Sequence, residues 1–201
     1  LTRILGLARL IELAEDENDR GNILDKLVSS TRDLDSVIRD LNSILDIRKH
    51  TRDLRQVSLQ NALDLVNRTL EKEFEATNAK MHVDLRVDKV YAVAPYVESI
   101  LYNLLSNAIK YRHPDRDPEI TVRSGADREF IHLTVSDNGL GIDLSRHRND
   151  MFNLYKRFHL HMEGKGAGLY MVKTQMVAQG GKVEVESIPG EGSTFSLLFK
   201  R

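Results

Sequence analysis

The chain has 201 residues, of which 41% are hydrophobic and 29% charged, a balance typical of a soluble globular protein with one or two domains. Its formal net charge of -1 gives no general basic field, so nucleic acid is not expected as a partner. The lack of cysteine excludes disulfide bonds and thiolate chemistry. No apolar run approaches the roughly 18 residues of a membrane span, so we expect this chain to contact no membrane, although the full-length protein could be membrane-anchored. The lack of cysteine permits a cytoplasmic location, which we expect for this chain.

Two helical segments are predicted before residue 55. The helical pattern runs from Leu1 to about Ala14 and again from about Gly21 to His50, with a charged stretch between them. In the second segment, apolar side chains and one threonine follow the spacing of a heptad seam: Leu27, Thr31, Leu34, Ile38, Leu41 and Leu45. Because one hairpin buries little apolar surface, residues 1–54 are expected to form half of a four-helix bundle that a second copy completes. Packing of this seam onto the rest of the same chain is the alternative.

Residues 55–201 alternate helices with short strands rich in β-branched side chains, which predicts a second domain of mixed α and β structure. Residues 138–168 carry little helix or strand pattern outside 151–158, and a long loop in a compact domain is usually functional, so we expect a lid there. The expected helices lie at 59–78, from Pro95 onward and at 167–179, and the expected strands at 81–87, 90–94, 120–124, 130–136, 182–187 and 193–200.

The helix that follows Pro95 carries polar side chains on one face. Asn103 and Asn107 are four residues apart and Lys110 follows three residues later, with Tyr111 next, while the opposite face is apolar. Amide oxygens are good ligands for Mg²⁺, which usually binds through substrate phosphates as well, and an ammonium can meet phosphate charge. Taken alone, the two asparagines are more simply residues of an exposed, solvated helix face.

Asp137 stands at the end of a predicted strand, and Gly139 and Gly141 follow it. Its carboxylate could accept a hydrogen bond from an exocyclic amine, while the glycines allow the backbone to approach a flat ring. In isolation, however, an Asp-Asn-Gly sequence is more simply a turn.

Two further glycine clusters follow in the chain. Residues 164–169, Gly-Lys-Gly-Ala-Gly-Leu, stand at a helix start, where unpaired N–H groups form an anion site. Residues 190–195 include Thr194 and by themselves indicate only a hairpin turn. Neither cluster fits a Rossmann site, because the strand that precedes the Rossmann glycine motif is absent. Neither fits a P-loop, because the chain does not contain the sequence GxxxxGK[ST].

Taken in order, these clusters resemble the ATP-binding domain of sensor histidine kinases, which belongs to a class shared with gyrase, Hsp90-type chaperones and MutL-type ATPases. The resemblance extends over nearly the whole chain. It implies an α+β architecture: a dimerisation hairpin followed by a two-layer α/β sandwich of mixed sheet and helices, the Bergerat-type ATPase fold. Residues 152–158 resemble the phenylalanine box of that family, within the expected lid.

The resemblance also implies roles for individual residues, with ATP and Mg²⁺ as cofactors. Asn107, helped by Asn103, would hold Mg²⁺ on the triphosphate, and Asp137 would read the adenine amino group. Lys110, Tyr111 and Arg157 would contact phosphate or ribose. The remaining members of the implied ATP-binding set are Gly139, Gly141, Gly164, Lys165, Gly166, Gly168, Leu169 and Thr194.

Asn103 bears on the reaction type. Hydrolases of the wider class have a glutamate at this position, which can activate water as a general base, whereas an amide cannot. Resemblance therefore implies phosphoryl transfer to a histidine and then to a response-regulator aspartate. None of the seven histidines is followed by the arginine and proline of the family's acceptor motif, His-x-x-Arg-x-Pro, so the acceptor is expected upstream of Leu1.

Two other interpretations remain open from the sequence. The chain could be another enzyme of the same class, such as a protein serine kinase or a stand-alone ATPase. It could also be a non-catalytic dimeric scaffold with a vestigial pocket, although the intact asparagine and glycine clusters argue against that. Rapid phosphate release would favour an ATPase, and undetectable ATP binding would favour a scaffold.

Overall fold

The computed structural model describes residues 2–14, 16–17, 19–31, 34, 53–148, 150–154, 156 and 166–201. The chain divides into two compact units, residues 1–46 and 47–201. The predicted boundary between residues 54 and 55 stays a prediction, because residues 35–52 lie outside the described ranges. None of the helices in these ranges combines the length and apolar character needed to cross a membrane.

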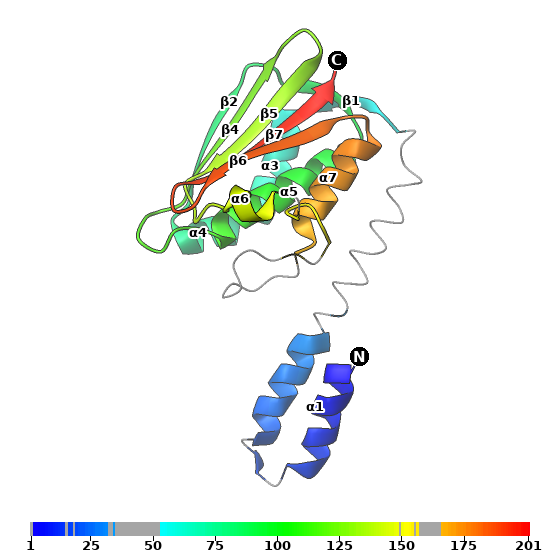
Figure 1. Cartoon of the computed structure of the whole chain (residues 1–201), viewed down its shortest axis with the longest axis vertical. Coiled ribbons are helices and arrows are strands. Elements are labelled where there is room, and N and C mark those ends of the chain that lie inside the picture. The colour runs from blue at the N-terminus through cyan, green and yellow to red at the C-terminus, as the bar shows by residue number, and fades with distance from the viewer. Residues whose placement is uncertain are drawn as a thin grey trace. The chain divides into compact units, whose positions relative to one another are not determined.

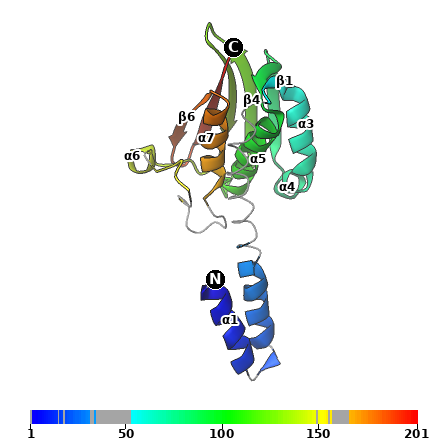
Figure 2. The same ribbon diagram turned by 90° about the vertical axis from the view of Figure 1, so that its right-hand side faces the viewer.

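The first unit contains two antiparallel helices that lie side by side in both views (Figures 1 and 2). Helix α1 spans Thr2–Leu13, and residues 19–31 are helical as well. On α1, Leu5, Leu10 and Leu13 are 64%, 51% and 70% exposed. The hairpin therefore leaves apolar surface uncovered. The predicted seam residues Ile38, Leu41 and Leu45, together with His50, lie outside the described residues.

The second unit is built on a five-stranded mixed sheet, as predicted (Figure 1). The strand order is β2-β4-β5-β7-β6, in which β2 and β4 are parallel and all other neighbours are antiparallel. The strands are β2 (Lys80–Leu85), β4 (Glu119–Ala126), β5 (Phe130–Asp137), β6 (Lys182–Ile188) and β7 (Gly192–Lys200). Because β5 and β7 are central neighbours, residues at their ends meet in the middle of the sheet edge.

Three helices cover one face of this sheet, with α5 in the middle (Figure 2). They are α3 (Leu59–Thr69), α5 (Ala94–Lys110) and α7 (Gly168–Ala178). Pro95 lies in the first turn of α5, where a missing N–H costs nothing. The apolar side of α5 is fully buried, with Ile100, Leu101 and Leu105 at 0% exposure. This packing confirms the predicted two-layer arrangement and leaves the polar side of α5 free to build a site.

The structure differs from the sequence prediction in three elements. The predicted helix at 59–78 is two helices, α3 and α4 (Glu71–Thr77), which meet at Leu70, where the backbone leaves the helical conformation with φ -99° and ψ 10°. Strand β1 (Arg55–Ser58) was not predicted and pairs with β3 (Lys89–Ala92) in a separate two-stranded sheet. A short helix, α6 (Leu144–His147), lies within the stretch expected to be a lid.

Candidate nucleotide-binding site

The first part of the site is the polar face of α5. Asn103 donates from Nδ2 to the carbonyl of Ser99 one turn earlier, at 2.8 Å. This bond fixes the orientation of the amide and leaves Oδ1 available as an acceptor. Asn107 lies one turn further along the same face and, like Asn103, is half-buried. The two predicted ligand residues are therefore neighbours whose amides lie at the surface of one helix.

The start of α7 lies directly against these two asparagines. A Cβ atom built on Gly168 would lie 2.8 Å from Oδ1 of Asn103 and 3.6 Å from Nδ2 of Asn107. Only a residue without a side chain allows the backbone at the N-terminus of α7 to approach the amides this closely. The structure thus brings Gly168 together with the asparagine pair, although 61 residues separate Gly168 from Asn107 in the sequence.

Lys110 and Tyr111 stand at the C-terminal end of α5. The Nζ atom of Lys110 lies 4.7 Å from the centre of the Tyr111 ring, a cation–π distance. The carbonyl of Tyr111 accepts a hydrogen bond from the backbone N–H of Leu140 at 2.9 Å. The end of α5 is therefore joined to the loop that follows Asp137.

Asp137 forms the other part of the site, at the end of β5. Its Oδ1 accepts from the N–H of Gly139 at 2.9 Å, and the backbone N–H of Ser193 donates to the same carboxylate. Burial raises the pKa of Asp137 above its ordinary value of 3.8, and the two hydrogen bonds offset this only in part. A partly buried carboxylate with directed hydrogen bonds is suited to accept one further bond from a ligand.

The glycines after Asp137 allow a close approach between the loop and the β6–β7 hairpin. Gly141 has a positive φ of 65°, and a Cβ there would clash with the carbonyl of Ile188. The N–H of Gly190 donates to the carbonyl of Leu140 at 2.8 Å. The loop is thus held between the end of α5 on one side and the hairpin on the other.

Thr194, predicted for the site, lies on the other face of the sheet from Asp137. Ser193 is the residue directly opposite Asp137 in the strand register, and Thr194 is opposite Ser136. Neighbouring residues of a strand point to opposite faces of the sheet, and the hydroxyl of Thr194 donates to Ser136 at 3.0 Å. The ATP-binding role of Thr194 stays a prediction, while Ser193 lies on the face that carries Asp137. The alternation of Ser193 with the apolar Phe195 and Leu197 was the sequence signal that could have identified it.

Two described residues of the predicted lid, Gly166 and Lys156, lie in close contact. Gly166 has a positive φ of 71°, and a Cβ there would clash with the carbonyl of Lys156. Leu169, also predicted for the site, is half-buried in the first turn of α7. Arg157, Gly164 and Lys165 lie outside the described residues, so their predicted roles remain predictions.

The site residues that the structure describes therefore form two groups joined by α5. One group is the amide pair with Gly168, and the other is Asp137 with Ser193, Gly139 and the end of the helix. The eight helical steps from Asn103 to Tyr111, the residue that directly follows α5, rise about 12 Å along the helix axis. Among the described residues there is no cluster of three or more His, Asp or Glu side chains that could hold a metal ion. A metal at the amide pair would therefore need further ligands, such as phosphate oxygens.

Comparison with known proteins places this architecture in a family. Residues 92–201, more than half of the chain, match the model of the histidine kinase-, DNA gyrase B-, and HSP90-like ATPase family. The chain belongs to this family. The resemblance to the ATP-binding domain of sensor histidine kinases is thereby confirmed.

Individual relatives agree with this assignment. The phosphate regulon sensor protein PhoR of Pseudomonas aeruginosa is 29% identical over 209 residues, which cover 99% of this chain and 46% of PhoR. The histidine kinase AdeS of Acinetobacter baumannii has a similar fold, with a TM-score of 0.74, 20% identity and coverage of 99% of this chain and 93% of that one. Full-length ShkA in complex with AMPPNP has a TM-score of 0.70 at 19% identity, over 99% of this chain and 43% of ShkA. The chain thus spans about half the length of PhoR and of ShkA.

Proposed function

We propose that this chain is the ATP-binding and dimerisation part of a sensor histidine kinase in a two-component system. One observation carries the proposal: α5 joins an amide pair beside the N-terminus of α7 to the loop of a partly buried carboxylate, Asp137, about 12 Å along the helix from Asn103. These two ends offer the chemistry that a nucleotide requires, an anion and metal site at one end and an acceptor for a base at the other. The AMPPNP complex of ShkA supports ATP as the nucleotide.

At the base end, Asp137 would accept a hydrogen bond from the exocyclic amine of adenine. The N–H groups of Gly139 and Ser193 hold its carboxylate in one orientation. Gly139 and Gly141 keep the loop thin, so a flat ring could lie close to the backbone. Guanine carries a carbonyl oxygen where adenine carries the amine, so this carboxylate would favour adenine.

At the phosphate end, the amide oxygens of Asn103 and Asn107 would hold Mg²⁺ together with triphosphate oxygens. The observation that fits a metal is the orientation of Asn103, whose Nδ2 donates to Ser99 while Oδ1, on the side of Gly168, accepts no hydrogen bond from the residues that the structure describes. When bound, Mg²⁺ would neutralise phosphate charge. The N-terminus of α7 and Lys110 would add positive potential, and Arg157, Tyr111 and Lys165 complete the proposed set.

The proposed reaction is phosphoryl transfer rather than hydrolysis. Asn103 offers no carboxylate that could take a proton from water. The γ-phosphorus would form a bond to an imidazole nitrogen while its bond to the bridging oxygen breaks and ADP leaves, and the phosphoryl group would then pass to an aspartate of a receiver domain. Transfers of this kind depend mainly on positioning and charge neutralisation. The receiver domain is the proposed partner, in the cytoplasm.

The N-terminal hairpin would supply dimerisation. Its two helices leave large apolar side chains exposed, and Leu5, Leu10, Leu13, Leu24 and Val28 are each at least 42% exposed. Covering such a stripe with the same stripe of a second copy would form a four-helix bundle, in which each hairpin contributes two helices.

Isothermal titration of the chain with ATP and Mg²⁺ tests the proposal directly. Wild type should bind, and Asp137→Asn should bind roughly 10- to 100-fold more weakly, because a hydrogen bond to a charged group contributes about 1.5–3 kcal/mol. Asp127→Asn, a change of the same kind at an exposed hairpin turn, is the matched control and should bind as wild type does. Equal affinity of wild type and Asp137→Asn would refute the role of Asp137, and a wild type that binds no ATP would refute the nucleotide site.

Phosphate release separates the proposed transfer from hydrolysis. The wild-type chain with ATP and Mg²⁺ should release phosphate only slowly, whereas Asn103→Glu should release it faster, because the new carboxylate can act as a general base. Asn103→Gln keeps the amide and is the control. Rapid release by wild type would favour a stand-alone ATPase, and acid-stable phosphate on a partner would favour a serine kinase.

A further inference from the structure

Arg116 lies in the segment between α5 and β4, residues 111–118, which is held in place at its C-terminal part. Asn78 donates to the carboxylate of Asp117 at 2.7 Å, and Asn138 donates to the Asp117 carbonyl at 3.0 Å. The N–H of Lys80 also donates to the carbonyl of Pro118 at 2.8 Å. The backbone around Arg116 is therefore anchored to β2 and to the loop after Asp137. The Cα atom from which the Arg116 side chain extends thus has a fixed position.

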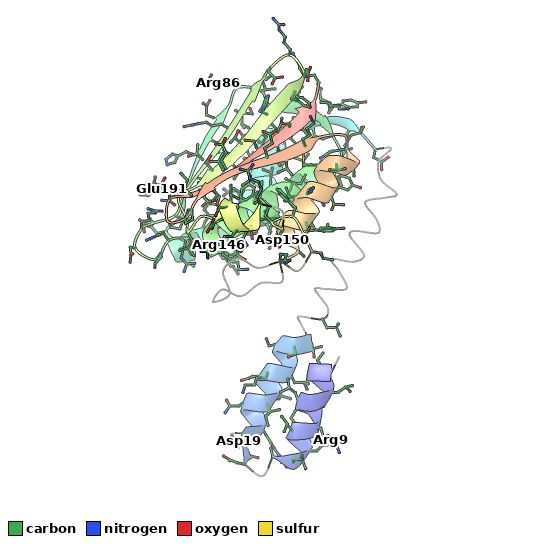
Figure 3. The ribbon with its side chains drawn as sticks, in the orientation of Figure 1. Arg9, Asp19, Arg86, Arg146, Asp150 and Glu191 are labelled. Carbon is green, nitrogen blue, oxygen red and sulfur yellow. The ribbon has the colours of Figure 1, made fainter. Side chains whose placement is uncertain are left out.

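The guanidinium of Arg116 donates to four backbone carbonyls from two separate segments. Nε lies 2.7 Å from the carbonyl oxygen of Asn138, and Nη2 lies 3.2 Å from that of Gly139. The same Nη2 lies 2.6 Å from the carbonyl of Gly190 and 3.3 Å from that of Glu191, at the turn between β6 and β7. Figure 3 labels Glu191 at this turn. One side chain thus joins the loop after Asp137 to the turn that precedes Ser193.

The contact to Asn138 reaches Asp137 through a single peptide group. The carbonyl of Asn138 and the N–H of Gly139 belong to the same planar peptide, so they point in opposite directions. Arg116 holds the carbonyl end, and Oδ1 of Asp137 accepts from the N–H end at 2.9 Å. A shift of this peptide would therefore move the hydrogen bond that orients the Asp137 carboxylate, and hydrogen bonds in such a chain strengthen one another.

The geometry points to Arg116 as a positioning residue that sets the adenine preference of the site without contacting the nucleotide. The inference rests on the proposed function, because it assigns Arg116 to the base end of the proposed ATP site. Arginine suits the role, since its planar fork of donors can serve several carbonyls at once, whereas lysine is a flexible point charge. Nη2 of Arg116 is a donor that the carbonyls of Gly139 and Gly190 share.

Two substitutions separate positioning from simple electrostatics. Arg116→Gln removes the charge and the fork, and Arg116→Lys keeps the charge but removes the fork. Loss of a residue that orients a ligand-binding group costs about 10- to 100-fold in affinity at metal sites, so we expect both variants to bind ATP roughly tenfold more weakly. Arg128→Gln, which removes an exposed arginine from the β4–β5 turn, is the matched control and should bind as wild type does.

A comparison of two nucleotides with different bases distinguishes this role from a merely structural one. Inosine triphosphate carries an oxygen in place of the adenine amine, so its binding should not depend on Asp137. In both Arg116 variants, affinity for ATP should fall toward that for inosine triphosphate, while the latter stays unchanged. An equal loss for both nucleotides, or full retention of ATP affinity by Arg116→Lys, would overturn the inference.

A measurement without nucleotide separates failure of this inference from failure of the proposed function. Hydrogen exchange at the amides of Leu140 and Gly190 reports the contacts of the loop to α5 and to the hairpin. Exchange at both amides should be faster in Arg116→Gln than in wild type and unchanged in Arg128→Gln. Unchanged exchange in Arg116→Gln would overturn the inference even if ATP binds, and a wild type that binds no ATP would overturn the ATP site and with it the adenine preference.

Discussion

Gly168 and Asn103 are in such close contact that a Cβ on the glycine would lie 2.8 Å from Oδ1 of the asparagine. The contact joins the N-terminus of α7 to the polar face of α5. Asn103 cannot yield freely, because its Nδ2 is hydrogen-bonded to the carbonyl of Ser99. The two helices therefore hold the amide in one position, with its oxygen at the start of α7.

Gly168→Ala should consequently weaken binding of ATP with Mg²⁺. The new methyl group would rotate Asn103 away and break its bond to Ser99, and a net hydrogen bond contributes about 1 kcal/mol, or roughly fivefold in affinity. Titration calorimetry measures the change, and circular dichroism checks that the fold is retained. Gly125→Ala is the control, because a Cβ at Gly125 would meet no atom within 4 Å. Wild-type affinity in Gly168→Ala would contradict the assigned role of the contact.

Ser193 and Thr194 provide a pair of neighbouring hydroxyls with opposite expected effects. The hydroxyl of Ser193 lies 2.9 Å from that of Ser187, on the face of the sheet that carries Asp137. Ser193→Ala keeps the backbone N–H that meets Asp137 and removes only the hydroxyl contact to Ser187, so it should weaken ATP binding by at most about fivefold, the value of one net hydrogen bond. Thr194→Ala should leave affinity unchanged, because its hydroxyl lies on the opposite face. A larger effect at Thr194 than at Ser193 would refute the strand register as the basis of the assignment.

The stability of the nucleotide-free chain should depend on pH through Asp137. Burial raises the pKa of Asp137 in the folded state. The folded protein therefore holds the proton of this carboxyl group at a pH where the unfolded chain, with the ordinary pKa of 3.8, has lost it. The stability that Asp137 contributes is present below that value and is lost as pH rises through the folded pKa. Asp137→Asn should therefore gain stability relative to wild type as pH rises.

Urea unfolding at pH 4 and pH 7.5 measures this effect. The free energy of unfolding of Asp137→Asn, minus that of wild type, should be larger at pH 7.5 than at pH 4. The same difference at both pH values would contradict the raised pKa. The variant that binds ATP less well is thus expected to gain stability relative to wild type between the two pH values, since an ionised carboxylate kept for binding costs folding energy.

Sequence patterns predicted those helices and strands of the second unit in which buried side chains recur at regular spacing. The apolar stripe of α5 and the alternation in β5 come directly from packing against one face, so their positions could be read from spacing. Strand β1 was missed because its four residues include a single buried apolar side chain, Val57. The break at Leu70 was missed because a leucine at that position also fits a continuous helix.

The candidate site was predictable in its motifs but not in its supporting contacts. Asp137, Asn103 and Gly168 belong to recognisable clusters, whereas Ser193 required the register of β7 against β5. Arg116 lies in a charged loop with no periodic pattern, and its four carbonyl partners come from segments 22 to 75 residues away. Contacts between a side chain and distant backbone depend on the tertiary fold, and no local spacing encodes them.

The exposed leucines of the hairpin lead to a prediction about association. Leu10 is 51% exposed on α1, and burying it against a second copy would favour a dimer. Leu10→Lys should shift the chain toward monomer in analytical ultracentrifugation, because a lysine at an apolar interface is costly to desolvate. Glu12→Lys introduces the same side chain at an exposed polar position two residues away and is the control. ATP affinity should be unchanged in both variants, since the proposed site lies within the second unit. A Leu10→Lys chain that sediments as wild type does would refute dimerisation through this stripe.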